Sequence, residues 1–369
     1  MIYKPFGNTG IDISALGFGC MRLPMTTKGG ESVVDDTLAI PLLQKAVEMG
    51  INFFDTHWFY CNYDSKRAVG DAVRLIRDKV YISSKVPPHL IDKPEDFTDY
   101  FYKTLEAMEL EYLDFLHISA MSYPIWKDMV LGYKLIDRAE KLKAKGLIHH
   151  LSFSFHSDTD KMSELIDTGA FSSIMGQYNI VDRENEEIFA YAQSKGVGTI
   201  VMSPLMGGVL TDGGNTFLAK MESGASSAAE MALRFIWGLP YVDMVLSGMS
   251  DMRQLEENVA CANQIGSIPP EERQALIKRS ASLHSFTDLY CTDCNYCNVC
   301  PHEIKIGSIF QLYLQHQIWG LSDSVRARRK DVKKLPSACT ECGDCSARCP
   351  QKIDIPTEMK RVWPVIQGL

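Results

Sequence analysis

The chain has 369 residues, of which 46% are hydrophobic and 23% charged, and its formal net charge is −8. This composition is that of a globular protein, and the length suits one large domain with an appendage. The negative charge argues against general nucleic-acid binding. We see neither a signal peptide nor the run of about 20 apolar residues that spans a bilayer, so we expect a cytoplasmic protein with no membrane segment.

Strand-like and helical patterns alternate along the first two thirds of the chain. Residues 3–14 predict a hairpin that turns at Asn8, Thr9 and Gly10. Amphipathic patterns such as 38–50 and 133–146 predict helices that end at glycine. Apolar and β-branched runs predict eight strands, at 14–19, 51–56, 79–84, 113–119, 148–154, 172–178, 197–202 and 243–248.

Eight strands alternating with helices over about 250 residues indicate an α/β fold, a (β/α)8 TIM barrel. A doubly wound sheet is the alternative, but the strand count and the missing Gly-rich dinucleotide fingerprint argue against it. Polar residues mark three successive strand ends: Asp55 and Tyr60 follow the second strand, Lys85 follows the third, and His117 ends the fourth. Because barrel active sites lie at the C-terminal ends of the strands, these four residues indicate a catalytic centre.

Cysteines are concentrated near the end of the chain. Eight of the eleven lie between residues 291 and 349, whereas Cys20, Cys61 and Cys261 are scattered and are most simply small core residues. Without an export signal, metal ligation is a better interpretation of the crowded cysteines than disulfide formation. The spacing C-x2-C-x2-C-x3-C-P at 339–350 is that of a bacterial-type [4Fe–4S] site.

A similar array at 291–301 is one residue shorter before its last cysteine. The spacing predicts two [4Fe–4S] clusters, with each array lending its last cysteine to the other cluster. One cluster would be held by Cys291, Cys294, Cys297 and Cys349, and the other by Cys339, Cys342, Cys345 and Cys300. The shortened array could instead close on itself, and paired zinc sites are a further alternative that the spacing disfavours.

Residues 265–290 contain a Pro-Pro pair and a helical run, and we place the domain boundary there. The expected division is a barrel over 1–275 and a small, mainly helical, ferredoxin-like domain over 276–369. In the second part, residues 300–310 echo 349–359 as an internal repeat. The basic run 325–334 is either a solvated helix face or a docking patch for an acidic partner.

Several motifs resemble those of the aldo-keto reductases, over essentially all of residues 1–265. "FFDTHWFY", "ISSKV" and "YLDFLHIS" match the family's Asp-Thr-x-x-x-Tyr, lysine and histidine segments. The chain is more closely similar to the subgroup fused to a ferredoxin-like tail, by "GFGCMRLP", "SFSFH", "SPLMGG", "LSGMS" and both cysteine arrays. The resemblance implies an oxidoreductase that reduces a small carbonyl compound, or oxidises an alcohol, with NADP(H) or NAD(H).

The resemblance also implies a role for each strand-end residue. Tyr60 would donate the proton, Lys85 would stabilise its phenolate, Asp55 would hold Lys85, and His117 would orient the carbonyl. Loops after the seventh and eighth barrel strands often bind phosphate. The cofactor contacts implied are Ser154, Gln177, Ser203, Leu205, Gly207, Gly208, Gly248, Met249, Ser250, Gln254 and Asn258.

Some positions depart from the family pattern. Met202 stands where an aromatic residue usually stacks on the nicotinamide, and Phe155 and Met175 replace an asparagine and a glutamine at the carboxamide. Gln254, beside Arg253, replaces an arginine at the adenosine phosphate, and Lys66 replaces a glutamate. The pattern thus alters the nicotinamide site while leaving the four catalytic residues intact.

Two other functions fit the same residues. A nicotinamide transfers two electrons at once and each cluster transfers one, so a flavin such as FMN in the barrel could connect the clusters to a ferredoxin- or flavodoxin-like partner. Alternatively, the clusters could sense oxygen on an inactive barrel. The aromatic residues that follow the second and fourth strands either line the substrate pocket or pack in the core: His57, Trp58, Tyr123 and Trp126.

Overall fold

The computed structural model describes residues 1–369 except 157, 223, 265–267 and 285–288. The chain forms two compact units. The first comprises Met1–Tyr178, Arg183–Met202 and Leu239–Ser267, and the second comprises Asn179–Asp182, Ser203–Gly238 and Ile268–Leu369. The division expected from the sequence is contiguous, whereas each of these units collects separate stretches of chain.

Parallel strands close into a barrel in the first unit, and neighbouring strands pair in chain order until the last pairs with the first. Each predicted strand overlaps its counterpart, so the predicted (β/α)8 barrel is confirmed. The strands are β3 (Leu16–Gly19), β6 (Phe53–Asp55), β7 (Tyr81–Val86), β8 (Leu113–Met121), β9 (Ile148–Phe155), β10 (Ser173–Gln177), β11 (Gly198–Met202) and β12 (Met244–Gly248).

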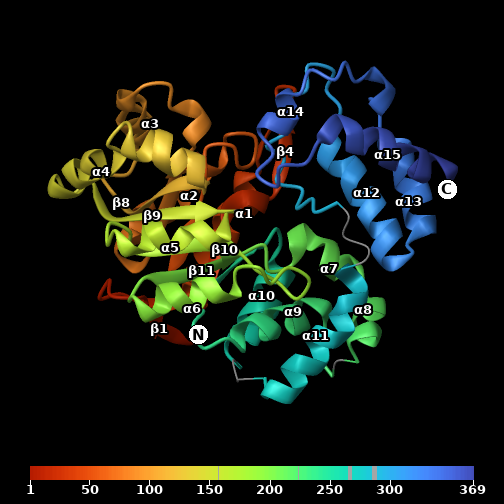
Figure 1. Ribbon diagram of the computed structural model, residues 1–369, viewed down its shortest axis with the longest axis horizontal. Helices are drawn as coiled ribbons and strands as arrows, with labels where there is room; N and C mark the ends of the chain where they lie inside the picture. Colours follow the sequence, from red (N-terminus) through yellow and green to blue (C-terminus); the bar gives the residue numbers. More distant parts are fainter. Residues whose placement is uncertain (157, 223, 265–267, 285–288) are drawn as a thin grey trace. The chain divides into compact units, whose positions relative to one another are not determined.

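Helices of the first unit pack on these strands and on one another (Figure 1). The Asp35 carboxylate caps the first helix by accepting a hydrogen bond from Thr37 N at 3.0 Å. Gly50 and Gly146, both at positive φ, follow the two helices predicted to end at glycine. The helices are α1 (Asp36–Glu48), α2 (Ser65–Val73), α3 (Pro94–Met108), α4 (Leu135–Ala144), α5 (Met162–Asp167), α6 (Glu186–Ser194) and α10 (Met252–Ala262), with a π-helix at Ile125–Leu131 and 3₁₀ turns at Cys20–Arg22, Arg74–Lys79, Pro88–Leu90 and Thr159–Lys161.

Two antiparallel hairpins precede α1. The predicted one joins β1 (Tyr3–Pro5) to β2 (Asp12–Ser14). The other joins β4 (Met25–Lys28) to β5 (Glu31–Val34) and was not predicted. Its turn residues, Gly29 and Gly30, both have positive φ, so the Gly-Gly pair was the sequence signal for a two-residue hairpin turn.

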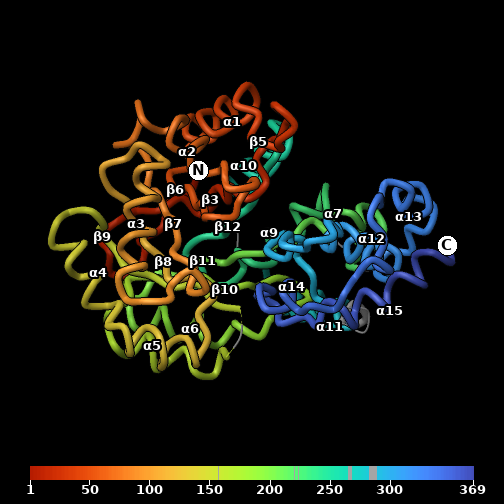
Figure 2. The backbone as a smooth tube through the Cα atoms, turned by 90° about the horizontal axis from the view of Figure 1, so that it is seen from above, coloured from red at the N-terminus to blue at the C-terminus, as the bar shows by residue number. Residues whose placement is uncertain are grey.

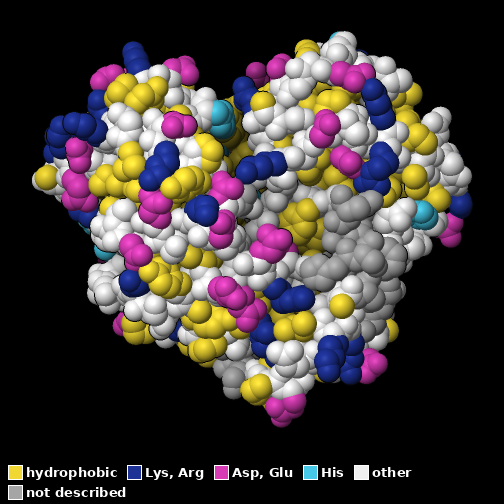
Figure 3. All heavy atoms as spheres, in the orientation of Figure 1, with side chains coloured by type: hydrophobic (Ala, Val, Ile, Leu, Met, Phe, Trp, Pro, Cys, Tyr) yellow, Lys and Arg dark blue, Asp and Glu magenta, His cyan; other side chains and the backbone are white. Residues whose placement is uncertain are grey.

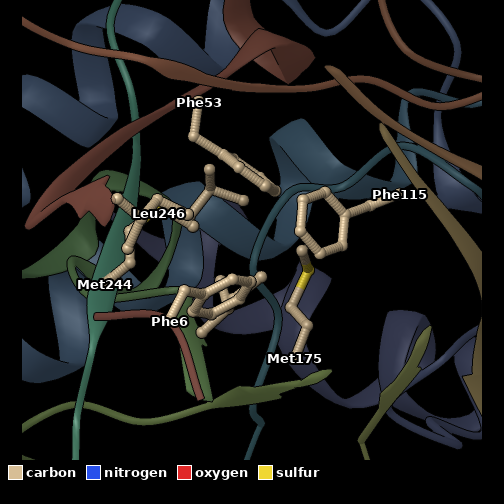
Figure 4. Close-up of a cluster of buried hydrophobic side chains, with 8 residues drawn as sticks. Phe6, Phe53, Phe115, Met175, Met244 and Leu246 are labelled. Atoms are coloured by element: carbon tan, nitrogen blue, oxygen red, sulfur yellow. The ribbon is translucent and has the colours of Figure 1, made fainter. Parts of the chain in front are cut away.

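An apolar layer fills the barrel interior below the strand ends. Phe6 lies against Phe115, with ring centroids 5.5 Å apart, and Phe53 and Met175 complete the contact (Figure 4). Side chains on a strand alternate between its two faces, so the next inward position lies two residues further along the strand. That position is Asp55 on β6 and His117 on β8, and the packed layer therefore forms the floor beneath the strand-end residues.

The second unit is helical in its described residues. Its later helices α12, α13 and α15 lie side by side in Figures 1 and 2. Ile306 begins α12 six positions after Cys300, and Ile355 begins α15 six positions after Cys349, so the predicted repeat is present. The elements are α7 (Val209–Asp212), α8 (Gly214–Met221), α9 (Ala228–Trp237), α11 (Pro270–His284), α12 (Ile306–Trp319), α13 (Ser322–Arg328), α14 (Asp344–Ala347) and α15 (Ile355–Gly368), with 3₁₀ turns at Met206–Gly208, Arg329–Asp331 and Pro336–Ala338.

Part of the basic run 325–334 serves the packing of this unit. Arg329 Nη1 donates to the Ile366 carbonyl at 2.9 Å, at the C-terminal end of α15, where cations are favoured. Arg328 Nη1 donates to Gln315 Oε1 at 2.7 Å on α12. Charged side chains of both signs are interspersed over the face of the protein shown in Figure 3.

Candidate active site and metal-binding cysteines

A buried ion pair lies at the ends of β6 and β7. Lys85 Nζ donates to Asp55 Oδ1 at 2.5 Å, to Asp55 Oδ2, and to the Thr56 carbonyl at 3.2 Å. Ser83 Oγ donates to the same carboxylate at 2.9 Å. Burial raises the pKa of Asp55 and lowers the pKa of Lys85, and each charge opposes the shift of the other. Each partner therefore favours the ionised form of the other, against the cost of burial.

Tyr60 lies beside this pair on the loop after β6. Lys85 Nζ is 5.3 Å from the centre of its half-buried ring. The ring centroid of His57 is 5.2 Å from that of Tyr60. Cys61, Asn62 and Tyr63, the next residues, all have positive φ, a conformation that costs free energy in non-glycine residues. The loop thus holds Tyr60 in a geometry that the local chain does not favour by itself.

His117 completes the set from β8. It is fully buried, and neither ring nitrogen has a hydrogen-bond partner among the described residues. Burial and the charge of Lys85 hold the pKa of His117 well below the usual range. The backbone of Phe153 raises this pKa by a smaller amount, although it makes no hydrogen bond to the ring. The imidazole is therefore neutral, and its unsatisfied nitrogens cost about 1–3 kcal/mol that a ligand oxygen could recover.

Two further histidines, His57 and His156, lie close enough to Lys85 for its charge to lower their pKa values. His57 accepts from Phe59 N at Nδ1 and lies 3.3 Å from Ser119 Oγ at Nε2, so Nε2 carries the hydrogen. Burial lowers the pKa of His156 to about 4, and its buried Nδ1 has no partner among the described residues. Sequence analysis missed His156, although it continues the inward alternation of β9.

The other aromatic candidates pack against protein. Trp58 lies between Lys66, whose Nζ is 3.8 Å from the ring centroid, and Tyr100. Trp126 is buried against Phe171. Tyr123 Oη donates to Glu164 at 2.9 Å. These contacts favour core packing for Tyr123 and Trp126, whereas the buried indole N–H of Trp58 has no partner among the described residues. His57 contacts the catalytic candidate Tyr60.

Lys66 is a buried cation on α2. It is 2% exposed, and its Nζ donates a hydrogen bond to the Trp58 carbonyl at 3.4 Å. Burial lowers the pKa of Lys66 to about 8, against an opposing effect of Asp64. The folded protein therefore releases this proton near pH 8, whereas the unfolded chain holds it to about pH 10.4. Charged Lys66 costs folding free energy below pH 8, and the cost disappears as the pH rises toward 10.4.

We expect Lys66→Met to increase the free energy of unfolding by about 1–3 kcal/mol at pH 7, because it removes the buried charge but keeps the length of the chain. The gain should shrink when anaerobic urea unfolding, followed by circular dichroism, is repeated at pH 9.5. Lys103→Met is the matched control, since Lys103 also lies over an aromatic ring, that of Tyr100, but is exposed. A gain of equal size at both pH values would mean that packing, and not charge, is responsible.

The cofactor candidates differ in their surroundings. Ser154 and Gln177 are buried, and Ser154 Oγ accepts from Ala120 N at 3.3 Å. Met175 lies in the apolar layer, so Gln177 is the next inward polar side chain on β10. Ser203, Gly207 and Gly208 have positive φ, and the half-buried Leu205 precedes the 3₁₀ turn that contains both glycines.

The candidates after β12 are partly engaged with one another. Gly248 and Ser250 are exposed and Met249 between them is buried. Gln254 Oε1 accepts from Ser250 N at 2.9 Å, and Asn258 Nδ2 donates to Ser247 Oγ at 3.1 Å. Gln254 and Asn258 thus shape the loop through these contacts.

The eight array cysteines fall into two sets in the second unit, and each set lines one cavity. The first cavity is lined by Cys291, Cys294, Cys297 and Cys349, with apolar neighbours that include Phe310, Ile353 and Ile355. The second cavity is lined by Cys300, Cys339, Cys342 and Cys345, with His302 and Thr340. Cys342 is exposed, whereas Cys291, Cys297 and Cys345 are buried. Each cavity therefore combines three cysteines of one array with the last cysteine of the other.

The thiols of the first set are costly to ionise without a cation. Burial, with smaller repulsion from Cys294 and Cys349, raises the pKa of Cys291 to about 12, and Cys297 shifts in the same direction. A multiply charged metal core that binds thiolates would offset this cost. Among the described residues, no three metal-binding side chains converge as a single ion requires. The scattered cysteines Cys20 and Cys261 are buried, as expected, and Cys61 is half-buried.

Comparison with known proteins identifies both parts of the chain. The profile of the aldo/keto reductase family matches residues 15–276. The chain belongs to the aldo/keto reductase family. The profile of the 4Fe-4S dicluster domain matches residues 290–353, so the oxidoreductase carries an iron–sulfur domain as the cysteine spacing indicated.

Relatives of this reductase cover the barrel. L-galactose dehydrogenase of Arabidopsis thaliana is 26% identical over 72% of this chain and 89% of its own length. An uncharacterized oxidoreductase of Bacillus subtilis is 24% identical over 78% of this chain and 97% of its own length. The holo form of an aldo-keto reductase from Bacillus halodurans has a TM-score of 0.64 and 24% identity, over 76% of this chain and 96% of that one. This structural match confirms the fold.

A Klebsiella pneumoniae aldo-keto reductase, solved with NADP and acetate, has a TM-score of 0.62 and 20% identity. It covers 75% of this chain and 94% of its own length.

None of the helices formed by the described residues combines the length and apolar character that crossing a membrane requires.

Proposed function

We propose that this protein interconverts a small carbonyl compound and its alcohol with NADP(H) or NAD(H), at Asp55, Tyr60, Lys85 and His117. The observation that supports this most is His117, a buried neutral imidazole that lacks a partner among the described residues and lies beside the Lys85–Asp55 pair. Such a group is suited to bind an uncharged carbonyl oxygen. Family membership supports the reaction class.

Bound NAD(P)H would supply the hydride for the carbonyl carbon. Tyr60 donates its phenolic proton to the carbonyl oxygen, where negative charge develops. Lys85, 5.3 Å from the Tyr60 ring, stabilises the phenolate that remains. Asp55 fixes Lys85 in place and balances its charge in the buried site. His117 donates a hydrogen bond to the same oxygen and so orients the substrate.

The residues that would hold the cofactor suit a phosphate-bearing molecule. A Cβ atom at Gly208 would meet a single neighbour within 4 Å, Thr211 Oγ1 at 3.9 Å. Gly248 is exposed. Glycines of this kind let the backbone approach a phosphate closely. Ser154 and Gln177 would contact the nicotinamide end.

We also propose that the eight array cysteines hold two [4Fe–4S] clusters with crossed ligation. The two cavities support this, because each is lined by four cysteines drawn from both arrays. Thiolates are the usual ligands of such clusters, and the clusters exchange one electron at a time.

The exposure of Cys342 favours a second function. An exposed cluster ligand is suited to electron exchange with an external ferredoxin- or flavodoxin-like protein. In that case FMN in the barrel would convert between one- and two-electron transfer, and the altered position Met202 would belong to a flavin site.

Cofactor analysis of anaerobically purified protein tests these functions. We expect a brown protein with about eight irons and matching sulfide per chain, and carbonyl-dependent consumption of NADPH or NADH. Stoichiometric zinc with little iron would contradict the cluster assignment. Stoichiometric FMN, with no reduction of any carbonyl by either nicotinamide, would favour the second function. Bound clusters without activity toward any carbonyl or electron carrier would favour an oxygen sensor.

A further inference from the structure

The Ser203–Gly208 loop and the first cysteine array approach each other closely within the second unit. Gly207 has a φ of +66°, and a Cβ atom there would lie 2.3 Å from the carbonyl oxygen of Thr292. Thr292 follows the buried Cys291 directly in the chain. Any larger residue at position 207 must therefore displace backbone that carries a cluster ligand.

Asn179 links the same two segments by hydrogen bonds. Its fully buried side chain donates from Nδ2 to the Ser203 carbonyl at 3.1 Å and to Tyr290 Oη at 2.9 Å. Its Oδ1 accepts from the backbone N–H groups of Val181 and Asp182, both at 3.0 Å. The amide is thus fixed by its own turn and connects the start of the loop to the residue before Cys291.

Helix α12 contacts both the first cysteine array and α7, the segment that follows the Ser203–Gly208 loop, through side chains on one of its faces. Gln311, Gln315 and Trp319 recur every four residues, so their side chains share a stripe. Gln311 Nε2 donates to the Cys291 carbonyl at 3.1 Å. Gln315 Nε2 donates to Asp212 at 2.6 Å, and Trp319 Nε1 donates to the Val209 carbonyl at 2.7 Å. The array and α7 are therefore anchored to one rigid element.

We infer that the first cysteine array supports the Ser203–Gly208 loop, so that nucleotide-phosphate binding at this loop is coupled to the cluster held by Cys291, Cys294, Cys297 and Cys349. Thr292, Asn179 and Tyr290 are the positioning residues of this coupling. The inference rests on the proposed cofactor role of the loop and on the proposed clusters.

Coupling of this kind is reciprocal. If the cluster-bearing array sets the loop geometry, then a ligand on the loop must perturb the array by the same free energy. The ligands of the second cavity make none of the contacts described above. A bound phosphate should therefore change the environment of the first cluster and leave the second unchanged.

Electron paramagnetic resonance of the intact, dithionite-reduced holoprotein tests this prediction. The probe is 2′-phospho-ADP-ribose, which carries the phosphates of NADP but no redox-active ring. We expect it to shift the signal of one cluster only. Cys294→Ser and Cys342→Ser identify the two signals, because each variant alters one ligand set.

Gly207→Ala should weaken probe binding about 10-fold, within the usual range of coupling, and should shift the signal of the first cluster even before the probe is added. A direct contact between Gly207 and the probe would not change that ligand-free signal. Gly214→Ala is the matched control: its φ is also positive, at +45°, but a Cβ atom there meets nothing within 4 Å. We expect it to bind the probe as the wild type does.

Tyr290→Phe provides a second variant that keeps the ring and removes one Asn179 contact. It should reduce the probe-induced shift with little change in iron content. Probe binding that leaves both wild-type signals unchanged, or shifts only the second cluster, would overturn the inference but not the proposed function. Failure of the wild type to bind any nicotinamide nucleotide or the probe would overturn both.

Discussion

Replacing Tyr60 with phenylalanine is expected to lower kcat for carbonyl reduction by about 100-fold or more, the usual effect of losing a general acid. The ring would keep its contacts with Lys85 and His57, so folding and cofactor affinity should change little. Steady-state kinetics, fluorescence titration of the nucleotide and circular dichroism would separate these effects.

Tyr63→Phe is the control for this experiment. Tyr63 lies on the same strained loop but is exposed, so loss of its hydroxyl should leave kcat within about twofold of wild type. If the Tyr60 variant kept wild-type turnover on the substrate, another group would have to be the proton donor, and His57 would be the first residue to examine.

Cys349→Ser is expected to reduce iron from about eight to about four per chain, if serine fails to replace the fourth ligand of one cluster. The remaining electron paramagnetic resonance signal should match that of Cys297→Ser, although these two cysteines belong to different arrays. The reason is that Cys349 lines the cavity of the first array and not that of its own.

Comparison with Cys345→Ser makes the test decisive. Cys345 belongs to the same array as Cys349 but lines the other cavity. If Cys349→Ser and Cys345→Ser removed the same signal, each array would close on itself and crossed ligation would be wrong. Cys261→Ala, outside both arrays, should retain the full iron content.

Local patterns were sufficient to predict the barrel strands. Strands such as β11 (Gly198–Met202) are buried in the barrel, and their apolar and β-branched character reflects that burial directly. The four catalytic candidates were found because the end of a strand can be located from the local sequence pattern. Asp55, Lys85 and His117 need only adjacent parallel strands to meet.

Features that depend on side chains from distant segments were not predicted. His156 looks ordinary in the sequence, and the departure of Lys66 from the family pattern did not predict its burial. Only packing removes water from both side chains and shifts their pKa values. The β4–β5 hairpin carried a Gly-Gly signal, but its strand residues are mostly exposed and lack an apolar alternation.

The barrel, its four catalytic candidates and the two cysteine arrays could be predicted from the sequence, because strand periodicity and ligand spacing are local properties of the chain. The spacing also predicted the crossed sets of cysteines, with self-closed arrays as the alternative, and the two cavities of the folded chain combine the cysteines in the crossed way. That the Ser203–Gly208 loop packs on the first array is visible only in the tertiary structure. The Gly207–Thr292 contact joins residues far apart in sequence. Such a contact depends on how helices such as α12 bring segments together, and no local pattern records it.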